Sequence, residues 1–361
     1  LFALFAALCC SCTESGTDEN TDPNGGSNSG QTTPPDPDSD AKDVIHVPKG
    51  GMLAGILNEL GLKSPSSLKL SGTLGVSDFT TLRNIQSLEH LDISRVNLSV
   101  LPTEAFLECT NIKSVILPNT LTAIGTQAFW GSSLVSISIP ASVETIEGGA
   151  FCRCTALQTV TFEKGSKLKT IETYVFYCTS LTSIEIPASV ETIEEDAFLG
   201  CSSLKTVTFE KGSKLKMIQY NTFRDCTSLT TIEIPASVET VEANAFNGCT
   251  SLKTVTFEKG SQLLMVDGYY MDNGAFVGCR ALTTVDMSAC TQVTEIGGYT
   301  FYEDSQLQLF KIGTRTPPSC GYNVFMGINS YSVLKVPAGC VDAYKKAKGW
   351  KGFTTISELD E

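Results

Sequence analysis

The reactive residue type that this sequence repeats most regularly is cysteine. Most members of one series follow a phenylalanine by three residues, and the series runs Cys109, Cys154, Cys178, Cys201, Cys226, Cys249 and Cys279. Evenly spaced thiols could indicate zinc, but the ligands of one zinc ion converge from tetrahedral directions. Ser132 and Asp304 take the same place in other copies of the pattern, which a zinc cage would not tolerate. We therefore predict that these cysteines are small buried side chains and not metal ligands.

A second series is acidic and runs Glu147, Glu172, Glu194, Gln219, Glu242 and Asp267. Carboxylates about 4.8 Å apart on neighbouring strands would repel one another by roughly 1 kcal/mol per pair in water. Either the strand ends there and the side chains extend into solvent, or the acids form a stripe for a basic partner or a weakly held Ca²⁺. No loop supplies the clustered oxygen ligands of a dedicated calcium site. Glu147, Glu172, Glu194, Glu242 and Asp267 are therefore candidate ligand-binding residues and not a predicted metal site.

Little in the sequence could support catalysis. It has two histidines, His46 and His90, which limits acid–base and metal chemistry near neutral pH. It lacks G-x-S-x-G, H-E-x-x-H, G-x-x-x-x-G-K-S/T and a dinucleotide-binding glycine motif after a strand. A formal charge of −13 disfavours nucleic-acid phosphate as a partner. We expect a protein that is not an enzyme, that binds no cofactor and no metal, and that has no nucleic-acid partner.

The elements that must position these residues are the units of a repeat. Segments such as "LKTVTF" (204–209) alternate apolar and polar residues, as a strand with one buried face does. A second short segment such as "VETIE" follows, and then a turn with the pattern "AFxxC". The phenylalanine recurs at intervals of 22 to 30 residues, as Phe106, Phe129, Phe151, Phe176, Phe198, Phe223, Phe246, Phe276, Phe301 and Phe325. A period of this length with leucine-rich strands predicts a leucine-rich solenoid.

Single units cannot fold alone. Each has about six large apolar side chains, whose burial contributes roughly 10–15 kcal/mol. Ordering about 23 residues at about 1–2 kcal/mol each costs more than that. Neighbouring units must therefore stack and share one core. In the middle of the chain two unit types alternate, so that "SVETIEGGAF", "SVETIEEDAF" and "SVETVEANAF" recur 47 and 48 residues apart.

These motifs resemble those of a known family. "AFxGCxSLxxVxF" and "IPASVETIE" are similar to the repeats of BspA-like leucine-rich repeat proteins of bacterial surfaces, over about residues 88–337. "LKLSGTLGVSDFTTLRN" (68–84) is similar to the N-terminal entry of such proteins, and "VLKVPAGCVDAYKKAKGW" (333–350) to their C-terminal cap. The resemblance implies a β-rich repeat solenoid with short strands and turns or short helices. It also implies adhesion to host matrix proteins, host cells or other microbes, without catalysis.

The central units depart from the family pattern at one position. Family units often have glycine after the isoleucine of the second strand, as at Gly125 and Gly297, whereas the central units have glutamate. A further column, Glu144, Lys169, Glu191, Lys216 and Glu239, alternates in charge, so we expect these residues to be cross-strand neighbours. In the Phe176 unit the cysteine follows after two residues, which predicts a tighter turn. Whether Cys320 and Cys340 form a disulfide is left open.

The N-terminus is typical of an export signal. "LFALFAALCCSC" joins an apolar run of eight residues to cysteines. This run is too short to span a bilayer of about 30 Å, and its context resembles the lipidation site of a bacterial lipoprotein. Cys12 follows the small residue Ser11 and is the predicted lipidated residue, with Cys10 second. A plain secretory signal is the alternative.

Residues 13–43 are rich in Gly, Ser, Thr, Pro, Asn and acid, and such a segment is expected to be a flexible tether. We expect a surface-exposed outer-membrane lipoprotein that contacts the membrane through its lipid anchor only. The predicted organisation is a signal peptide and lipobox (1–12), an acidic tether (13–43), an N-terminal cap region (44–87), the solenoid (88–337) and a C-terminal cap (338–361).

One insertion interrupts the repeat. "VDGYYMDNGAF" (266–276) is about five residues longer than "IEEDAF", and the extra residues include Tyr269, Tyr270 and Met271. Tyrosine and methionine are enriched at binding hot spots, so these three residues are candidates for ligand binding. The alternative is that the loop folds back and covers the neighbouring turn.

The favoured function is an adhesin-like surface protein whose solenoid binds an extracellular protein of a host or a microbe. The alternatives are a surface protein that captures a glycan for nutrient uptake and a structural surface component. Exposed aromatic platforms would favour a glycan, whereas faces rich in threonine and charge favour a protein, and such faces dominate this sequence.

Overall fold

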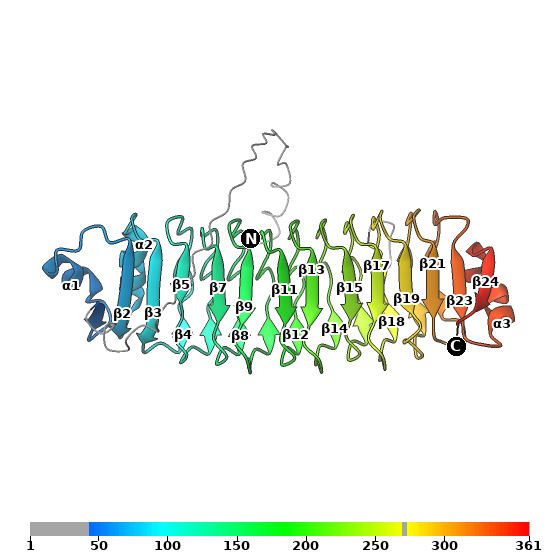
Figure 1. Ribbon diagram of the computed structural model, residues 1–361, viewed down its shortest axis with the longest axis horizontal. Coiled ribbons are helices and arrows are strands. Elements are labelled where there is room, and N and C mark those ends of the chain that lie inside the picture. Colours follow the sequence, from blue (N-terminus) through cyan, green and yellow to red (C-terminus); the bar gives the residue numbers. More distant parts are fainter. Residues whose placement is uncertain (1–42, 269–272, 361) are drawn as a thin grey trace, which may run out of the picture. The chain divides into compact units, whose positions relative to one another are not determined.

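The computed structural model describes residues 43–268 and 273–360, and Asp43–Glu361 form one compact unit. Cys12, Tyr269, Tyr270 and Met271 lie outside the described residues. The unit is a parallel β-solenoid of about 13 turns, which confirms the fold predicted from the repeat (Figure 1). Each regular turn runs through a main strand, a connection, a short second strand and a turn that contains the repeated phenylalanine.

The main strands form one sheet in which all neighbouring pairs are parallel. Its fourteen strands are, in order, β1 (Val44–Val47), β2 (Ser67–Gly72), β3 (His90–Val96), β5 (Ser114–Ile116), β7 (Ser136–Ile139), β9 (Thr159–Phe162), β11 (Ser183–Ile186), β13 (Thr206–Phe209), β15 (Thr231–Ile234), β17 (Thr254–Phe257), β19 (Thr284–Met287), β21 (Leu309–Ile312), β23 (Val333–Val336) and β24 (Thr355–Glu358). Pairing is in register in the centre, where Ile184 lies beside Val207 and Ile232 beside Val255. The alternating pattern therefore sends one row of apolar side chains into the core and leaves hydroxyl and charged side chains outside.

The short second strands form two sheets and not one. The first contains β4 (Val100–Leu101), β6 (Ala123–Ile124), β8 (Thr145–Ile146), β10 (Thr170–Ile171) and β12 (Thr192–Ile193). The second contains β14 (Met217–Ile218), β16 (Thr240–Val241), β18 (Met265–Val266), β20 (Glu295–Ile296) and β22 (Ser319–Cys320). At the boundary between β12 and β14 the solenoid is held together by its main sheet, by its core and by backbone hydrogen bonds between the phenylalanine turns, such as that from the Phe198 N–H to the Thr222 carbonyl at 3.0 Å.

The repeated phenylalanine rings form a ladder in the core. They lie between the short second strands and the segments that lead back to the main sheet. Consecutive rings from Phe106 to Phe301 lie with centroids 5.1–5.5 Å apart and are nearly parallel. All of these rings are almost completely buried. Because each ring contacts the ring of the next repeat, the ladder couples neighbouring repeats that could not fold alone.

Most phenylalanine turns have two positions with a left-handed backbone. They lie two residues before and two residues after the phenylalanine, and glycine occupies several of them, as at Gly200 and Gly248. All thirteen non-glycine residues with positive φ in the described chain fall at these two positions, with φ between 51° and 60°. Side chains there carry a backbone cost that glycine avoids.

The two ends of the solenoid are capped by short helices and additional strands. The helices are α1 (Leu53–Glu59), α2 (Val76–Asn84), α3 (Val341–Lys346) and the 3₁₀ helix η3 (Trp350–Gly352). At the N-terminal end the buried Asp78 carboxylate accepts hydrogen bonds from the backbone N–H groups of Gly51, Leu53 and Gly75, at 2.6, 3.0 and 2.8 Å. At the C-terminal end the buried Tyr344 and Trp350 cover the last rings of the ladder.

The central repeats form two-unit modules with a hydrogen bond inside each module. Three glutamates of the longer units, Glu163, Glu210 and Glu258, accept the backbone N–H of an alanine in the preceding shorter unit, Ala141, Ala188 and Ala236, at 3.2, 2.9 and 3.0 Å. This contact accounts for the alternation of "FEKGS" with "IPASV" in the sequence.

The cysteine column is buried, with the exception of Cys178, which is partly exposed. The thiols of Cys154, Cys201 and Cys249 also donate to the phenylalanine carbonyl of the preceding repeat, at 2.9, 3.0 and 3.2 Å. The thiols are therefore both filling groups and donors to the backbone.

The expectation of a tightened turn at Cys178 is wrong. Cys178 takes the left-handed position with φ 52°, and Thr179 takes the buried column position, 3.2 Å from the sulfur of Cys201. The turn therefore keeps its length. Cys320 and Cys340 are both free thiols.

Candidate binding surfaces

The described residues contain no group of three or more His, Cys, Asp or Glu side chains that could hold a metal ion. In the same residues no helix has the length and apolar character needed to cross a membrane.

The cysteine column can be tested directly. Burial raises the pKa of the Cys201 thiol to about 12 and that of Cys226 well above its ordinary value. The reactive species is the thiolate, so we expect both thiols to resist alkylation in the folded protein and to react after denaturation. Peptide mapping by mass spectrometry measures this, with the partly exposed Cys178 as an internal comparison. Labelling of Cys201 at the rate of Cys178, or a fall in Tm on addition of a chelator, would contradict a buried, metal-free column.

The outer face of the main sheet carries many hydroxyl side chains. One outward row consists of hydroxyl side chains on successive strands, and it runs Ser114, Ser136, Thr159, Ser183, Thr206, Thr231, Thr254 and Thr284. Glu185 and Glu233 lie in the next row, and both are exposed. A hollow of about 270 Å³ lies beside Thr208, Glu233 and Lys211.

The alternating charge column forms ion pairs in part. Lys169 lies 3.6 Å from Glu144, and Lys216 lies 2.6 Å from Glu239. Glu191 makes no ion pair among the described residues: its neighbour Lys169 pairs with Glu144, and on its other side β14 belongs to the other sheet. The two pairs are about half exposed, so each contributes only about 0–1 kcal/mol.

Carboxylates of the acidic column are partly exposed, and several of them bond to the backbone of the preceding repeat. The Glu147 carboxylate accepts hydrogen bonds from the N–H and the hydroxyl of Thr126, both at 2.9 Å. Glu172 accepts the N–H of Gly148 at 2.9 Å in the same way. Each carboxylate thus satisfies a backbone donor in the turn of the preceding repeat, which accounts for like charges at this spacing.

The remaining members of the column follow this arrangement to different degrees. Glu242 accepts the N–H of Tyr220 at 2.9 Å, whereas the Asp267 carboxylate accepts the adjacent N–H of Gly268 at 2.7 Å. Burial raises the pKa of Glu242, the neighbouring acids Asp267 and Glu195 add to the rise, and the Tyr220 N–H opposes it. Glu194 is half-buried in the same column.

Glycine replaces the glutamate where the backbones approach more closely. A Cβ at Gly125 would lie 2.5 Å from the carbonyl oxygen of Leu101, and one at Gly297 would lie 2.3 Å from the nitrogen of Gly268. In units with glycine, the backbone therefore packs directly against the backbone of the preceding repeat. In units with glutamate, a carboxylate lies between the two backbones and accepts a hydrogen bond.

A tyrosine cluster lies on the phenylalanine turns of the last repeats, and the sequence analysis missed it. The Tyr299 ring lies 5.5 Å from that of Tyr302 and 5.8 Å from that of Tyr322, at interplanar angles of 69° and 60°. Tyr322 is 71% exposed. Met326 adjoins the cluster, since its carbonyl accepts the N–H of Glu303, and its side chain is 56% exposed.

The backbone of the cluster carries a cost. Tyr299 has φ 57°, the left-handed backbone that this position also has at Gln127 and Asn244. A bulky aromatic side chain with this backbone is unusual. The residue two positions before each phenylalanine is the sequence signal that could have revealed the cluster. A smaller pair, Tyr174 and Tyr177, occupies the corresponding positions of an earlier turn.

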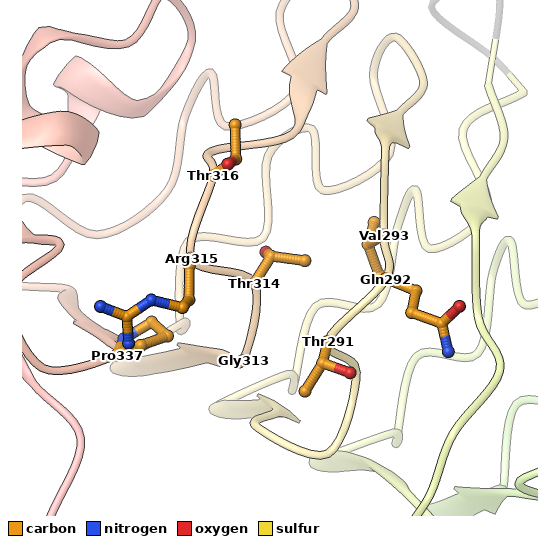
Figure 2. Close-up of a pocket in the computed structure, with 8 residues that line it drawn as sticks. All are labelled: Thr291, Gln292, Val293, Gly313, Thr314, Arg315, Thr316 and Pro337. Carbon is orange, nitrogen blue, oxygen red and sulfur yellow. The ribbon is translucent and has the colours of Figure 1, made fainter.

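A groove lies on the opposite edge of the same repeats, where the main strands end. It has a volume of about 530 Å³, and its walls are Thr291, Gln292, Val293, Gly313, Thr314, Arg315, Thr316 and Pro337. Figure 2 shows Arg315 on the side of Pro337 and Gln292 on the other side, with Thr314 and Val293 between them. Arg315 is the one charged residue of this set.

Comparison with known proteins identifies the repeat. The model of a family described as "BspA type Leucine rich repeat region" matches residues 78–177, 169–267 and 216–347, in six copies. No curated protein matches the chain.

Solved structures with a similar fold include those of three bacterial proteins. One is a leucine-rich repeat protein from Bacteroides ovatus ATCC 8483, with 23% identity over 82% of this chain and 82% of that chain and a TM-score of 0.45. A second is a leucine rich cell surface protein from Faecalibacterium prausnitzii A2-165, with 23% identity over 62% of this chain and 73% of that chain and a TM-score of 0.34. A third is the pneumococcal vaccine antigen PcpA, with 17% identity over 82% of this chain and 80% of that chain and a TM-score of 0.40.

Proposed function

Because the chain belongs to the BspA-type leucine-rich repeat family, we propose that it is an adhesin-like protein that binds an extracellular protein of a host or a microbe. Proteins of this family are cell-surface proteins, and the repeat solenoid is typically a binding scaffold without enzymatic activity. The family suggests a protein-binding role. The particular ligand and the site that holds it are our proposals.

The observation that carries this proposal is the tyrosine cluster with Met326. Tyr322 and Met326 are among the most exposed large apolar side chains of the described residues. Aromatic residues and methionine are enriched where protein partners bind, because they bury a large area with little loss of conformational entropy. The ring of Tyr299 contacts those of both Tyr302 and Tyr322, so the surface is partly pre-organised.

The remaining expectations stay part of the proposal. Cys12 would carry the lipid anchor of an outer-membrane lipoprotein, and residues 13–43 would place the solenoid away from the membrane. Tyr269, Tyr270 and Met271 would add to the binding surface, and the acidic column Glu147, Glu172, Glu194, Glu242 and Asp267 would favour a partner with basic residues.

A binding panel with matched variants tests the proposal. We expect Tyr322→Ala combined with Met326→Ala to weaken binding to a matrix or microbial surface protein by about 1–3 kcal/mol, since exposed aromatic anchors carry most of the energy of such contacts. Tyr331→Ala is the matched control, because Tyr331 is 85% exposed and is not part of the cluster. Biolayer interferometry measures both, and Tm shows whether either variant loses stability.

Two outcomes would contradict the proposal. Equal losses for the cluster variant and for Tyr331→Ala would remove the cluster from the site. The second candidate function is glycan capture, which the exposed tyrosine ring also suits, because a sugar can stack on an aromatic face. Binding on a glycan array that is lost with Tyr322→Ala, without binding to any protein of the panel, would favour that function instead.

A further inference from the structure

The groove beside Arg315 lies at a connection whose sequence differs from that of the regular repeats. In the central modules this edge carries the "EKGS" connection, but here the sequence is "IGTRTPPSC" (312–320). A Cβ at Gly313 would lie 2.2 Å from the carbonyl oxygen of Ser288, so only glycine allows the chain to pass so close to the preceding connection. The groove is open because the chain follows this inner path.

The C-terminal cap holds the wall of the groove in place. The Tyr344 hydroxyl donates to the carbonyl oxygen of Thr314 at 2.8 Å and lies 3.0 Å from the Thr314 hydroxyl. The indole N–H of Trp350 donates to the Pro318 carbonyl at 3.0 Å, so the same connection is fixed at both ends. Tyr344 and Trp350 are both completely buried. An irregular connection fixed by buried side chains is a pre-organised wall.

Arg315 is oriented by the cap but keeps donors for another group. One of its guanidinium nitrogens donates to the Ala338 carbonyl at 3.3 Å. A guanidinium has five N–H donors, and among the described residues Arg315 forms no ion pair. The planar fork of arginine matches a carboxylate with two parallel hydrogen bonds.

The other side chains of the groove suit a polyhydroxylated ligand. Thr291, Thr316 and Gln292 are exposed, and their hydroxyl and amide groups both donate and accept hydrogen bonds, as sugar hydroxyls do. Pro337 is half-buried and supplies apolar surface for the C–H groups of a sugar ring, whereas Val293 is buried beneath the groove. A volume of about 530 Å³ lies within the range of small-ligand sites.

We propose that this groove binds a sugar acid, a hexuronate or a similar carboxylate-bearing glycosyl unit, with Arg315 on the carboxylate and with Thr291, Thr316 and Gln292 on the hydroxyls. This site goes beyond the proposed protein-binding function and lies on a different edge of the repeats from the tyrosine cluster. The two sites can therefore be tested separately.

The test is isothermal titration calorimetry, in which the full chain is titrated with methyl β-D-glucuronide and, separately, with methyl β-D-glucoside. We expect the glucuronide to bind at least tenfold more tightly than the neutral glucoside and to bind more weakly as salt increases. Arg315→Gln is expected to remove this preference, whereas Arg315→Lys keeps part of it, because a lysine supplies charge without the fork. Thr316→Val, at an exposed side chain, is expected to weaken both sugars. Lys259→Gln is the matched control, because Lys259 is an exposed cation outside the groove.

Several results would overturn the proposal. They are equal binding of the two sugars, unchanged glucuronide binding by Arg315→Gln, and an equal loss with Lys259→Gln. Tighter binding of N-acetylglutamate amide than of the glucuronide would assign the groove to acidic peptides and would also overturn it. Tyr322→Ala is expected to leave glucuronide binding unchanged, so failure of the sugar site and failure of the protein-binding proposal give different results.

Discussion

Replacing Asp304 by cysteine is expected to raise the free energy of unfolding by about 1–3 kcal/mol, since a buried polar group without a partner carries a desolvation cost of that size. Asp304 is 0% exposed, and neither carboxylate oxygen has a hydrogen-bond partner among the described residues. It occupies the column position at which Cys249 and Cys279 donate their thiols to the phenylalanine carbonyl of the preceding repeat, at 3.2 and 3.3 Å. A cysteine at this position restores that donor and removes the carboxylate.

The gain is expected to depend on pH. Burial raises the pKa of the Asp304 carboxyl well above its ordinary value of 3.8. The folded protein therefore retains a proton that the unfolded chain releases above that pH, so the wild type loses stability as pH rises from the ordinary pKa toward the raised one. Asp304→Cys lacks this slope, and its advantage over the wild type should be larger at pH 8 than at pH 5.

Denaturant unfolding at the two pH values measures both effects. Ser132→Cys is the matched control, because Ser132 occupies the same column position but carries no charge. It is expected to change stability little and to leave the pH slope as it is in the wild type. An unchanged slope in Asp304→Cys, or a loss of stability at both pH values, would contradict the account of Asp304 as an unpaired buried acid.

Replacing Phe223 by alanine is expected to lower the free energy of unfolding by about 3–5 kcal/mol, the usual cost of removing a buried phenylalanine. Phe223 is completely buried, and its ring lies 5.2 Å from Phe198 and 5.4 Å from Phe246. The contact with Phe198 also spans the boundary between β12 and β14, where the second sheet is interrupted. The variant should therefore lose cooperativity as well as stability, because the ladder links the two halves there beside the main sheet and the backbone hydrogen bonds of the turns, without a continuous second sheet.

Phe151→Ala is the control for this second effect. Phe151 is equally buried in the ladder, but its repeat lies within a continuous second sheet, between β8 and β10. Both variants are expected to lose similar free energy, while only Phe223→Ala should broaden the thermal transition or divide it into two. Calorimetry measures the transitions, and identical single transitions for the two variants would show that the boundary is not a weak point.

The fold could be predicted because its determinants are local and repeated. The alternation of apolar residues in "LKTVTF" sets the buried face, and the recurring phenylalanine sets the period. The interruption between β12 and β14 could not be predicted, because Glu191 and Lys216 continue the charge alternation across it. In the Phe176 unit the buried column position is occupied by Thr179 and not by a cysteine. The sequence does not reveal this, because a cysteine two residues after the phenylalanine equally suggests a shorter turn.

The candidate binding surfaces were less accessible from sequence. The cluster depends on contacts between turns 20 or more residues apart, such as Tyr299 with Tyr322. The groove depends on Tyr344, which reaches Thr314 from a helix of the cap. The acidic column was located correctly, but its hydrogen bonds to the turn of the preceding repeat depend on the stacking of the units and are not visible in any single unit. Tyr269, Tyr270 and Met271 lie outside the described residues.

The two-unit modules have a consequence for how the length of this protein can change. Glu163 with Ala141 and Glu210 with Ala188 close the same hydrogen bond in consecutive modules that share most of their sequence. Unequal recombination between the corresponding stretches of the gene would add or delete 47 or 48 residues at a time. Each such event would alter the reach of the molecule by about 10 Å, two strand spacings. Every strand would keep a matching neighbour and both capped ends would stay unaltered, so we expect natural variants to differ in length by whole modules.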